Sequence, residues 1–232
     1  MTVPIFGANT SPVSGLPTQS LDMESSNTQY MSMSNSDFGS YDVSQFSIST
    51  WIYAESLTSQ IVAMFKNSEF LLTIGIDGSI NFSIGAGGTD FGRLITNASE
   101  ITTGSFFYIT ANFDFSESST NRLRLYKNGT EITSFSSEEV PTTQFSTTGN
   151  EARVGFGNSA APWDGLLYQH SFFSGANANP TTIYNSGTPI DIKDETGLYS
   201  MLNVAGGDVT NDLLLTAAWT NNNGVTASGT TP

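Results

Sequence analysis

The sequence predicts an all-β protein built from antiparallel strands, and two observations lead to that prediction. Apolar and polar residues alternate along several short segments, which is the period of half-buried strands. Turn-forming pairs separate these segments, above all Asn128-Gly129, which follows a strand-like run. Both central residues of a type I′ turn need a positive φ, which Asn and Gly tolerate, so this pair predicts a β-hairpin.

The chain divides into an arm, one domain and a tail. Residues 1–20 hold three of the eight prolines and no charged side chain, so we expect an extended arm there. We expect a single domain over 21–219, with its core in 21–174 and further strands in 190–219. The polar residues 220–232 are expected to form a flexible tail.

Within the domain, the alternation predicts a long strand over 46–55 and a tight hairpin at Asp77-Gly78. Residues 131–137 are expected to return as one strand after the Asn128-Gly129 turn. The last two strands are expected at 198–204 and 213–219. Residues 177–184 open with a capping pattern and predict the only short helix.

Composition restricts the partners. The formal charge is −14, from 21 acidic and 7 basic residues, which argues against nucleic acid and anionic membranes because both need clustered cations. There is no cysteine, so a disulfide framework or a thiolate metal site is not available. The first 19 residues lack the pattern of a signal peptide, and no apolar run is long enough to cross a bilayer. We therefore expect a protein made in the cytoplasm.

Five segments together resemble one known family. They read QFSISTWI (45–52), IDGSINF (76–82), LRLYKNG (123–129), ARVG (152–155) and WDGLL (163–167). Over about residues 21–174 they resemble laminin-G-like domains of the concanavalin A-like jelly-roll type. The resemblance implies an antiparallel two-sheet jelly-roll sandwich, here with an N-terminal extended arm.

The segment 183–189 and the acidic Ser/Thr/Asn-rich composition are also similar to those of marine bacteriophage virion structural proteins. This similarity implies a non-enzymatic capsid decoration (cement) or head-fibre protein, located in the virion and assembled in the host cytoplasm. It would attach through its arm and jelly-roll edge to the major capsid protein or other virion proteins, and we expect a homo-oligomer. Val3, Ile5 and Phe6 are the predicted contact residues of the arm.

The alternative is a carbohydrate-binding or adhesion module, lectin-like or receptor-binding, that recognises a host-surface glycan. Its predicted rim is Asn158, Trp163 and Asp164, because sugars bind where an aromatic ring lies beside hydrogen-bonding side chains. In the competing interpretation Trp163 covers the end of the core. Calcium stays open because oxygen ligands are abundant, but no calcium motif supports it, and Tyr168 stands where related domains commonly have Asp. No other cofactor is expected.

Catalysis is not predicted, and we assign no catalytic residue and no metal ligand. Glycosidases of the jelly-roll type carry an E-x-D-x-E strand motif, and a divergent hydrolase or lyase would need those carboxylates. The nearest sets are Asp22 with Glu24 and, in a turn-like segment, Asp191 with Asp194 and Glu195. Neither has the complete motif or an aromatic frame for a sugar ring, so we expect a solvated face. The single histidine, His170, is expected on one face with Tyr168 and Phe172, in a packed aromatic strip.

Overall fold

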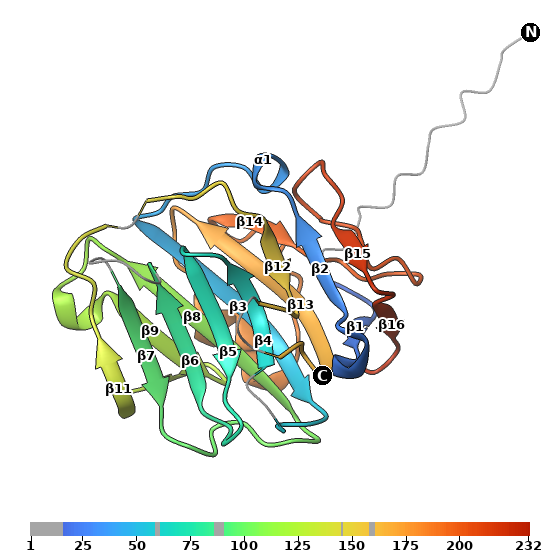
Figure 1. Cartoon of the computed structure of the whole chain (residues 1–232), viewed down its shortest axis with the longest axis horizontal. Coiled ribbons are helices and arrows are strands. Elements are labelled where there is room, and N and C mark those ends of the chain that lie inside the picture. Colours follow the sequence, from blue (N-terminus) through green and yellow to red (C-terminus); the bar gives the residue numbers. More distant parts are fainter. Residues whose placement is uncertain (1–15, 59–60, 86–90, 145, 158–160) are drawn as a thin grey trace, which may run out of the picture.

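The computed structural model describes residues 16–58, 61–85, 91–144, 146–157 and 161–232. Two antiparallel sheets pack face to face, with the strands of sheet B in front of those of sheet A in Figure 1. This arrangement confirms the predicted all-β jelly-roll sandwich. Each sheet has eight strands within the described residues.

Sheet A has its longest strands at its centre. Its strand order is β10 (Thr130–Ile132), β9 (Leu123–Lys127), β8 (Phe106–Asp114), β3 (Gln45–Ala54), β13 (Gly165–Ser174), β1 (Ser20–Met23) and β16 (Thr226–Ser228), and β14 (Leu198–Met201) pairs with β13. Because β3 pairs along nearly its whole length with both β8 and β13, these three strands form the rigid centre of the sheet.

Sheet B is built mainly from consecutive antiparallel strands. Its order is β11 (Phe135–Glu139), β7 (Gly92–Thr96), β6 (Ile80–Ile84), β5 (Phe70–Ile74), β4 (Ile61–Lys66), β12 (Ala152–Val154), β2 (Tyr30–Met33) and β15 (Thr220–Asn222). The short helical elements are η1 (Ser25–Asn27), α1 (Asn35–Phe38), η2 (Ser119–Asn121), α2 (Pro180–Tyr184) and η3 (Asn185–Gly187). Since α1 is a second short α-helix, the expectation of a single helix is wrong.

The core lies between the sheets and is rich in phenylalanine. Phe46 of β3 stacks on Phe172 of β13 with ring centroids 5.5 Å apart, and Phe82 of β6 meets Phe46 edge-on from the other sheet. All three rings are buried. The alternation of β3 thus places Phe46, Ile48 and Ile52 inward, as its period of two predicts.

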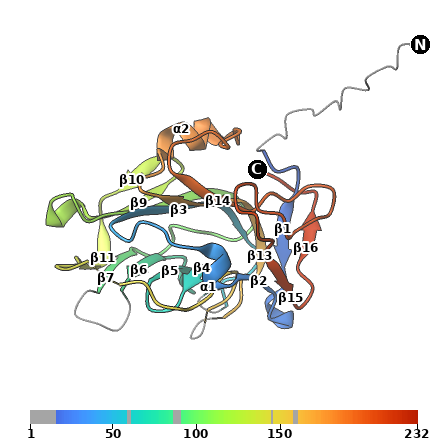
Figure 2. The same ribbon diagram turned by 90° about the horizontal axis from the view of Figure 1, so that it is seen from above.

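The outer face of sheet A is also covered. Trp51 of β3 and Tyr108 of β8 point outward, where Tyr184 of α2 packs on both rings. Figure 2 shows α2 above this face. The helix begins where the Asn179 side chain accepts a hydrogen bond from the Thr182 amide at 3.1 Å. The predicted helix within 177–184 is therefore confirmed.

The Asn128-Gly129 hairpin is confirmed in detail. Lys127 pairs with Thr130 across a two-residue turn, and the φ angles of Asn128 and Gly129 are 51° and 75°. The turn also docks on α2, because Thr181 donates its hydroxyl to the Gly129 carbonyl at 3.1 Å. The hairpin at Asp77-Gly78 has a longer loop than predicted, because the paired residues of β5 and β6 nearest the turn are Ile74 and Ile80.

A β-bulge in β13 changes which residues face the core. Gln169 has φ 50°, and two residues of β13, Gln169 and His170, lie opposite the single residue Thr50 of β3. Tyr168 consequently lies in the outer aromatic cluster, whereas Phe172 lies in the core. The prediction that Tyr168 and Phe172 share one face is therefore wrong.

The predicted flexible tail is instead paired into both sheets. β15 pairs with β2 of sheet B and β16 with β1 of sheet A, so the polar sequence is held by backbone hydrogen bonds rather than by apolar side chains. Between the two strands, Val225 is buried and its amide donates to the Asn221 side chain at 2.8 Å.

The C-terminal strands are only partly as predicted. β14 confirms the first, but residues 213–219 form no strand. Asp212 prevents one: its carboxylate accepts from the backbone amides of Leu214 and Leu215, each at 2.9 Å, and from the Trp219 indole at 2.9 Å. The chain curls around this buried carboxylate, which competes with a ladder for the backbone donors.

The predicted arm has two parts. Residues 1–15, with Val3, Ile5 and Phe6, lie outside the described residues. Residues 16–20 contact the domain: the Tyr168 hydroxyl donates to the Pro17 carbonyl at 2.7 Å. Strand β1 begins at Ser20.

Candidate functional site

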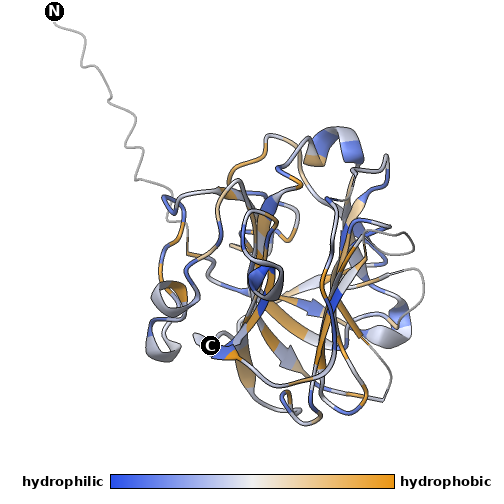
Figure 3. Cartoon of the chain, turned by 90° about the vertical axis from the view of Figure 1, so that its left-hand side faces the viewer, coloured by the Kyte–Doolittle hydropathy of each residue, from blue (hydrophilic) through white to orange (hydrophobic). Residues whose placement is uncertain are grey.

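The chain crosses from one sheet to the other at one edge of the sandwich. Residues 131–137, predicted as one return strand, divide: β10 ends at Ile132 in sheet A and β11 begins at Phe135 in sheet B. Figure 3 looks at this edge. The crossing leaves a pocket of about 320 Å³, here called the edge pocket. It is lined by Thr120, Asn121, Leu123, Arg124, Glu131, Ile132, Thr133, Phe135 and Glu138.

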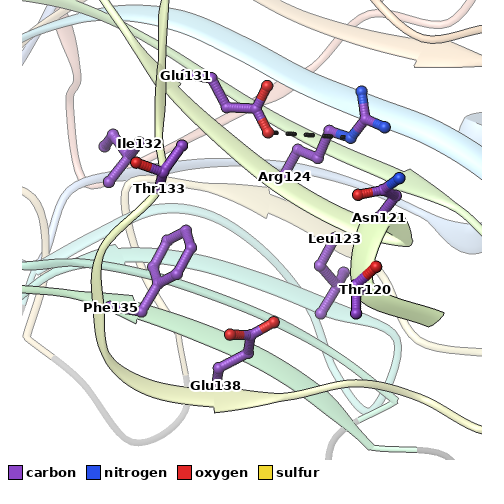
Figure 4. Close-up of a pocket in the computed structure, with 9 residues that line it drawn as sticks. All are labelled: Thr120, Asn121, Leu123, Arg124, Glu131, Ile132, Thr133, Phe135 and Glu138. Carbon is purple, nitrogen blue, oxygen red and sulfur yellow. Dashed lines mark ion pairs between the residues drawn. The ribbon is translucent and has the colours of Figure 1, made fainter. Parts of the chain in front are cut away.

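A β-bulge in β11 turns two side chains into the edge pocket. Phe135 pairs with Thr96, but Ser137 and Glu138 pair with Ile95 and Leu94, so Ser136 is an extra residue. Without it, Phe135 and Glu138 would point to opposite faces of the strand. With it both line the edge pocket, as Figure 4 shows.

Polar contacts on the outer side hold β11 in this register. Arg93 of β7 donates to the Ser137 hydroxyl at 3.2 Å and to the Glu139 carboxylate at 3.3 Å. The Asn97 side chain donates to the Ser134 hydroxyl at 3.0 Å, just before β11 begins. The contacts that anchor β11 are thus made by side chains other than those of Phe135 and Glu138, which face the edge pocket.

The floor of the edge pocket is apolar because the two sheets approach closely beneath it. Leu123 of β9 is buried, and a Cβ atom at Gly92 of β7 would lie 3.0 Å from a Leu123 methyl group and 2.6 Å from Pro141. The absence of a side chain at Gly92 permits this packing. Ile132 and Phe135 are half-buried and complete the apolar part of the lining.

Charged groups form the wall on the side of sheet A. Arg124 Nε lies 4.0 Å from Glu131 Oε1, the pair marked in Figure 4. The pKa of Arg124 is raised, chiefly by a hydrogen bond with Tyr126 and further by Glu131 and Glu117. The guanidinium thus stays charged and is surrounded by acceptors. Glu138 forms no ion pair with any other described residue.

At the opposite edge of the sandwich the chain also passes between sheets, from β15 to β16. Val225, which lies between these strands, is buried, and so is Trp219, which precedes β15. The residues around this second crossing are mostly polar, and the backbone pairing of β15 with β2 and of β16 with β1 holds them in place.

The rim predicted from the sequence is not a surface for stacking a sugar. Trp163 is 0% exposed and belongs to the core cluster, as the competing interpretation predicts, so its ring faces are not available to a ligand. Asp164 accepts a hydrogen bond from the Ser25 amide at 3.1 Å and is half-buried. Asn158 lies outside the described residues.

Carboxylates gather near Asp164 at this end of sheet A. Burial raises the pKa of Glu55, and the charges of Glu24, Asp22 and Asp164 raise it further. The predicted solvated face at Asp22 and Glu24 is thus part of a larger acidic group. Within the described residues, no three His, Asp or Glu side chains are arranged to hold a metal ion.

In a second group of half-buried aromatic residues, the ring faces are already covered by other side chains of the group. Tyr30 and Phe156 lie 5.5 Å apart, and the Arg153 guanidinium covers both rings at 5.2 and 5.8 Å. Arg153 is paired in turn with Glu151. Because the cation already lies over the rings, a ligand would have to displace it before stacking there.

His170 is excluded as a surface base by its burial. The side chain is 3% exposed, and burial lowers the pKa of the imidazole to about 3, so it stays neutral at physiological pH. This burial agrees with the prediction that His170 is packed. It has no access to a substrate at the surface.

Sequence analysis did not identify the residues of the edge pocket. The hairpin that carries Arg124 and Glu131 was predicted, but the strand exchange after Ile132 and the bulge at Ser136 were not. A local signal exists: Thr133-Ser134 follows a run of only three paired residues, and the bulge falls at the first residue of the pair Ser136-Ser137. That signal indicates a break in the strand, but it does not indicate the sheet in which the chain forms its next strand.

Comparison with known proteins confirms the family. Residues 25–180 match the family model Laminin_G_3, which is described as the concanavalin A-like lectin/glucanases superfamily. The chain belongs to this superfamily. No curated protein matches the sequence. Among the described residues, the structure holds no helix with the length and apolar character needed to span a bilayer.

Three solved structures illustrate the fold similarity. A putative carbohydrate-binding protein from Bacteroides ovatus has a TM-score of 0.66 at 16% identity, covering 92% of this chain and 60% of that one. A heptameric SAP-like pentraxin from Limulus polyphemus has a TM-score of 0.54 at 14% identity, covering 92% of both chains. The CBM40 module of a Ruminococcus gnavus IT-sialidase, bound to α2,3-sialyllactose, has a TM-score of 0.51 at 15% identity, covering 75% of this chain and all of that one. The chain thus spans 60% of the length of the first protein, and these similarities establish the fold alone.

Proposed function

We propose that this protein is a non-catalytic carbohydrate-binding domain and that the edge pocket is its glycan site. The observation that carries the proposal is the bulge at Ser136, which brings Phe135 and Glu138 to the same side of β11. An aromatic ring beside hydrogen-bonding side chains is the chemistry that sugar recognition needs. The volume of about 320 Å³ is at the small end for ligand pockets and suits one or two sugar units.

The polar lining can satisfy sugar hydroxyl groups. Arg124 donates hydrogen bonds, the carboxylates of Glu131 and Glu138 accept them, and Asn121 does both. Hydrogen bonds to charged groups are about twice as strong as neutral ones. Phe135 offers an apolar surface to the C–H face of a pyranose ring. The superfamily and the carbohydrate-binding neighbours support this proposal over other small ligands.

The proposal is non-catalytic because the edge pocket lacks the features of a glycosidase centre. A general acid needs a carboxyl group in apolar surroundings that raise its pKa. Glu131 and Glu138 are both exposed. An assay for polysaccharide cleavage accompanies the binding test, and turnover at enzyme-like rates would contradict this part of the proposal.

The test compares two single variants, Phe135→Ala and Phe156→Ala, with the wild type. Binding is screened on a glycan array and measured by isothermal titration calorimetry with the oligosaccharide that gives the strongest signal. We expect Phe135→Ala to weaken binding by roughly tenfold, as loss of one aromatic contact does. Phe156→Ala removes a half-buried ring remote from the edge pocket and should leave the affinity unchanged.

Three outcomes would contradict the proposal. One is binding that survives Phe135→Ala, and another is loss through Phe156→Ala instead. The third is a wild-type protein that folds but binds no glycan, together with a Phe135→Ala variant that aggregates. That result would mean that Phe135 and Glu138 serve to protect the edge strand β11 from pairing with other chains. Circular dichroism and gel filtration of each variant separate lost binding from lost folding.

The virion role stays a separate prediction. Attachment to a capsid protein through Val3, Ile5 and Phe6, and assembly as a homo-oligomer, concern residues 1–15 or surfaces that no comparison addresses. A glycan-binding domain carried on a virion would satisfy both interpretations. Deleting residues 1–19 and measuring occupancy on particles tests the arm without touching the edge pocket.

A further inference from the structure

We propose that the edge pocket selects neutral sugars and rejects acidic ones. This inference rests on the proposed glycan-binding function and names its ligand class. It follows from the charges that line the edge pocket: Arg124 and Glu131 are paired with each other, and Glu138 has no described cation as a partner.

The lining carries two carboxylates and one guanidinium. Arg124 is the cation, and it lies 4.0 Å from Glu131 and close to Tyr126, so its positive charge is already compensated. Glu138 is the remaining charge, and no described cation pairs with it. The lining is therefore net negative before a ligand arrives.

The nearby cations are directed elsewhere. Arg122 lies over the Phe115 ring at 4.2 Å and donates to the Pro141 carbonyl at 2.7 Å. Arg93 is on the outer side of β11, bound to Glu139. Neither lines the edge pocket, so a sugar carboxylate or sulfate would meet Glu138 with only Arg124, which is already paired with Glu131, to offset the repulsion.

A neutral sugar meets the opposite situation. The Glu138 carboxylate can accept hydrogen bonds from two neighbouring hydroxyl groups of a neutral pyranose, because no described side chain already donates to it. An anionic group about 7 Å from Glu138, screened at a partly exposed site, should lower affinity by roughly tenfold. The overall charge of −14 adds a weaker, salt-sensitive repulsion.

The experiment measures the ratio of affinities for a matched pair of probes. Polygalacturonic acid and its fully methyl-esterified form share one backbone and differ in charge; lactose and 3′-sulfolactose form a second pair. Affinity electrophoresis and calorimetry are run on the wild type, Glu138→Gln and the control Glu24→Gln. The control removes one exposed carboxylate at the other edge of the sandwich, so it reports the effect of net charge alone.

We expect the wild type to prefer the neutral member of at least one pair by roughly tenfold. Glu138→Gln should reduce that preference to about twofold or less, whereas Glu24→Gln should leave it unchanged. Equal or tighter binding of the acidic member, or a preference that Glu138→Gln does not change, would overturn this inference. If probes of both classes bind equally and depend on Phe135, only the selectivity fails. If neither class binds, the proposed function fails with it.

Discussion

A buried ion pair in the core gives a sharp test of how this sandwich is stabilised. Lys66 and Glu69 form the pair, and both side chains are 0% exposed. Glu69 also accepts from the Tyr41 hydroxyl at 2.6 Å, and from the amide and hydroxyl of Thr148 at 2.6 and 2.7 Å. We predict that Lys66→Met, which keeps the apolar length and removes the charge, destabilises the protein.

The size of the effect follows from what remains around Glu69. Removing one partner of a buried ion pair costs about 3–5 kcal/mol, because an uncompensated charge stays in the interior. Three neutral donors still point at the carboxylate, so we expect the lower limit, about 3 kcal/mol. In a protein of this size that loss lowers Tm by roughly 6–12 °C.

The assay is urea unfolding followed by tryptophan fluorescence, with a double variant as the internal check. Lys66→Met combined with Glu69→Gln removes both charges. The amide oxygen can still accept from Thr148, and the amide NH2 group can donate to the Tyr41 hydroxyl oxygen. We expect the double variant to recover about 2 kcal/mol of the loss. Lys193→Met, which breaks an exposed pair with Asp194, serves as the control and should leave the midpoint unchanged.

Two results would refute this reasoning. The first is a cost of less than about 1 kcal/mol for Lys66→Met, which would mean that the pair is effectively solvated. The second is a double variant less stable than Lys66→Met alone, which would mean that the carboxylate stabilises the fold without its cation.

Two further predictions concern the buried histidine and the tail. Burial lowers the folded-state pKa of His170 to about 3, so only the unfolded chain takes up its proton as the pH falls below about 6.5. The free energy of unfolding is therefore unaffected by His170 above that pH. Below it, the free energy of unfolding falls by about 1.4 kcal/mol per pH unit down to pH 3. His170→Gln should remove this slope from the plot of unfolding free energy against pH between pH 6.5 and 4.5. Parallel plots for the variant and the wild type would contradict the lowered pKa of His170. Deleting residues 220–232 removes Val225 and the edge strands β15 and β16. We expect the free energy of unfolding to fall by roughly 3 kcal/mol and the protein to aggregate through the exposed edges of β1 and β2. A truncated protein as stable and monomeric as the full chain would restore the flexible-tail interpretation.

Much of the architecture was predictable because local pattern and turn chemistry agree with the final fold. The Asn128-Gly129 turn needs two positive φ angles that few other pairs tolerate, and here it joins two strands that pair with each other. The alternation of 46–55 and the capping residue Asn179 are equally local signals. These features, together with the family segments, were sufficient to predict two antiparallel sheets.

The sequence could not show where strands change face or change sheet. The bulges at Ser136 and Gln169 each insert one residue, which reverses the alternation beyond them. The tail residues 220–228 lack an apolar pattern, yet they pair because β1 and β2 offer unpaired backbone groups at the sheet edges. Such pairing depends on partners about 190 residues away in the chain.

By itself the sequence determined that this chain forms an acidic, cysteine-free antiparallel sandwich with a defined set of hairpins, because those properties depend on composition and on neighbouring residues. Only the tertiary structure decided that Trp163 is buried and that Phe135 and Glu138 meet Arg124 at the open edge. The physical reason is that a side chain's face is set by strand register, and register is settled by pairing between distant segments.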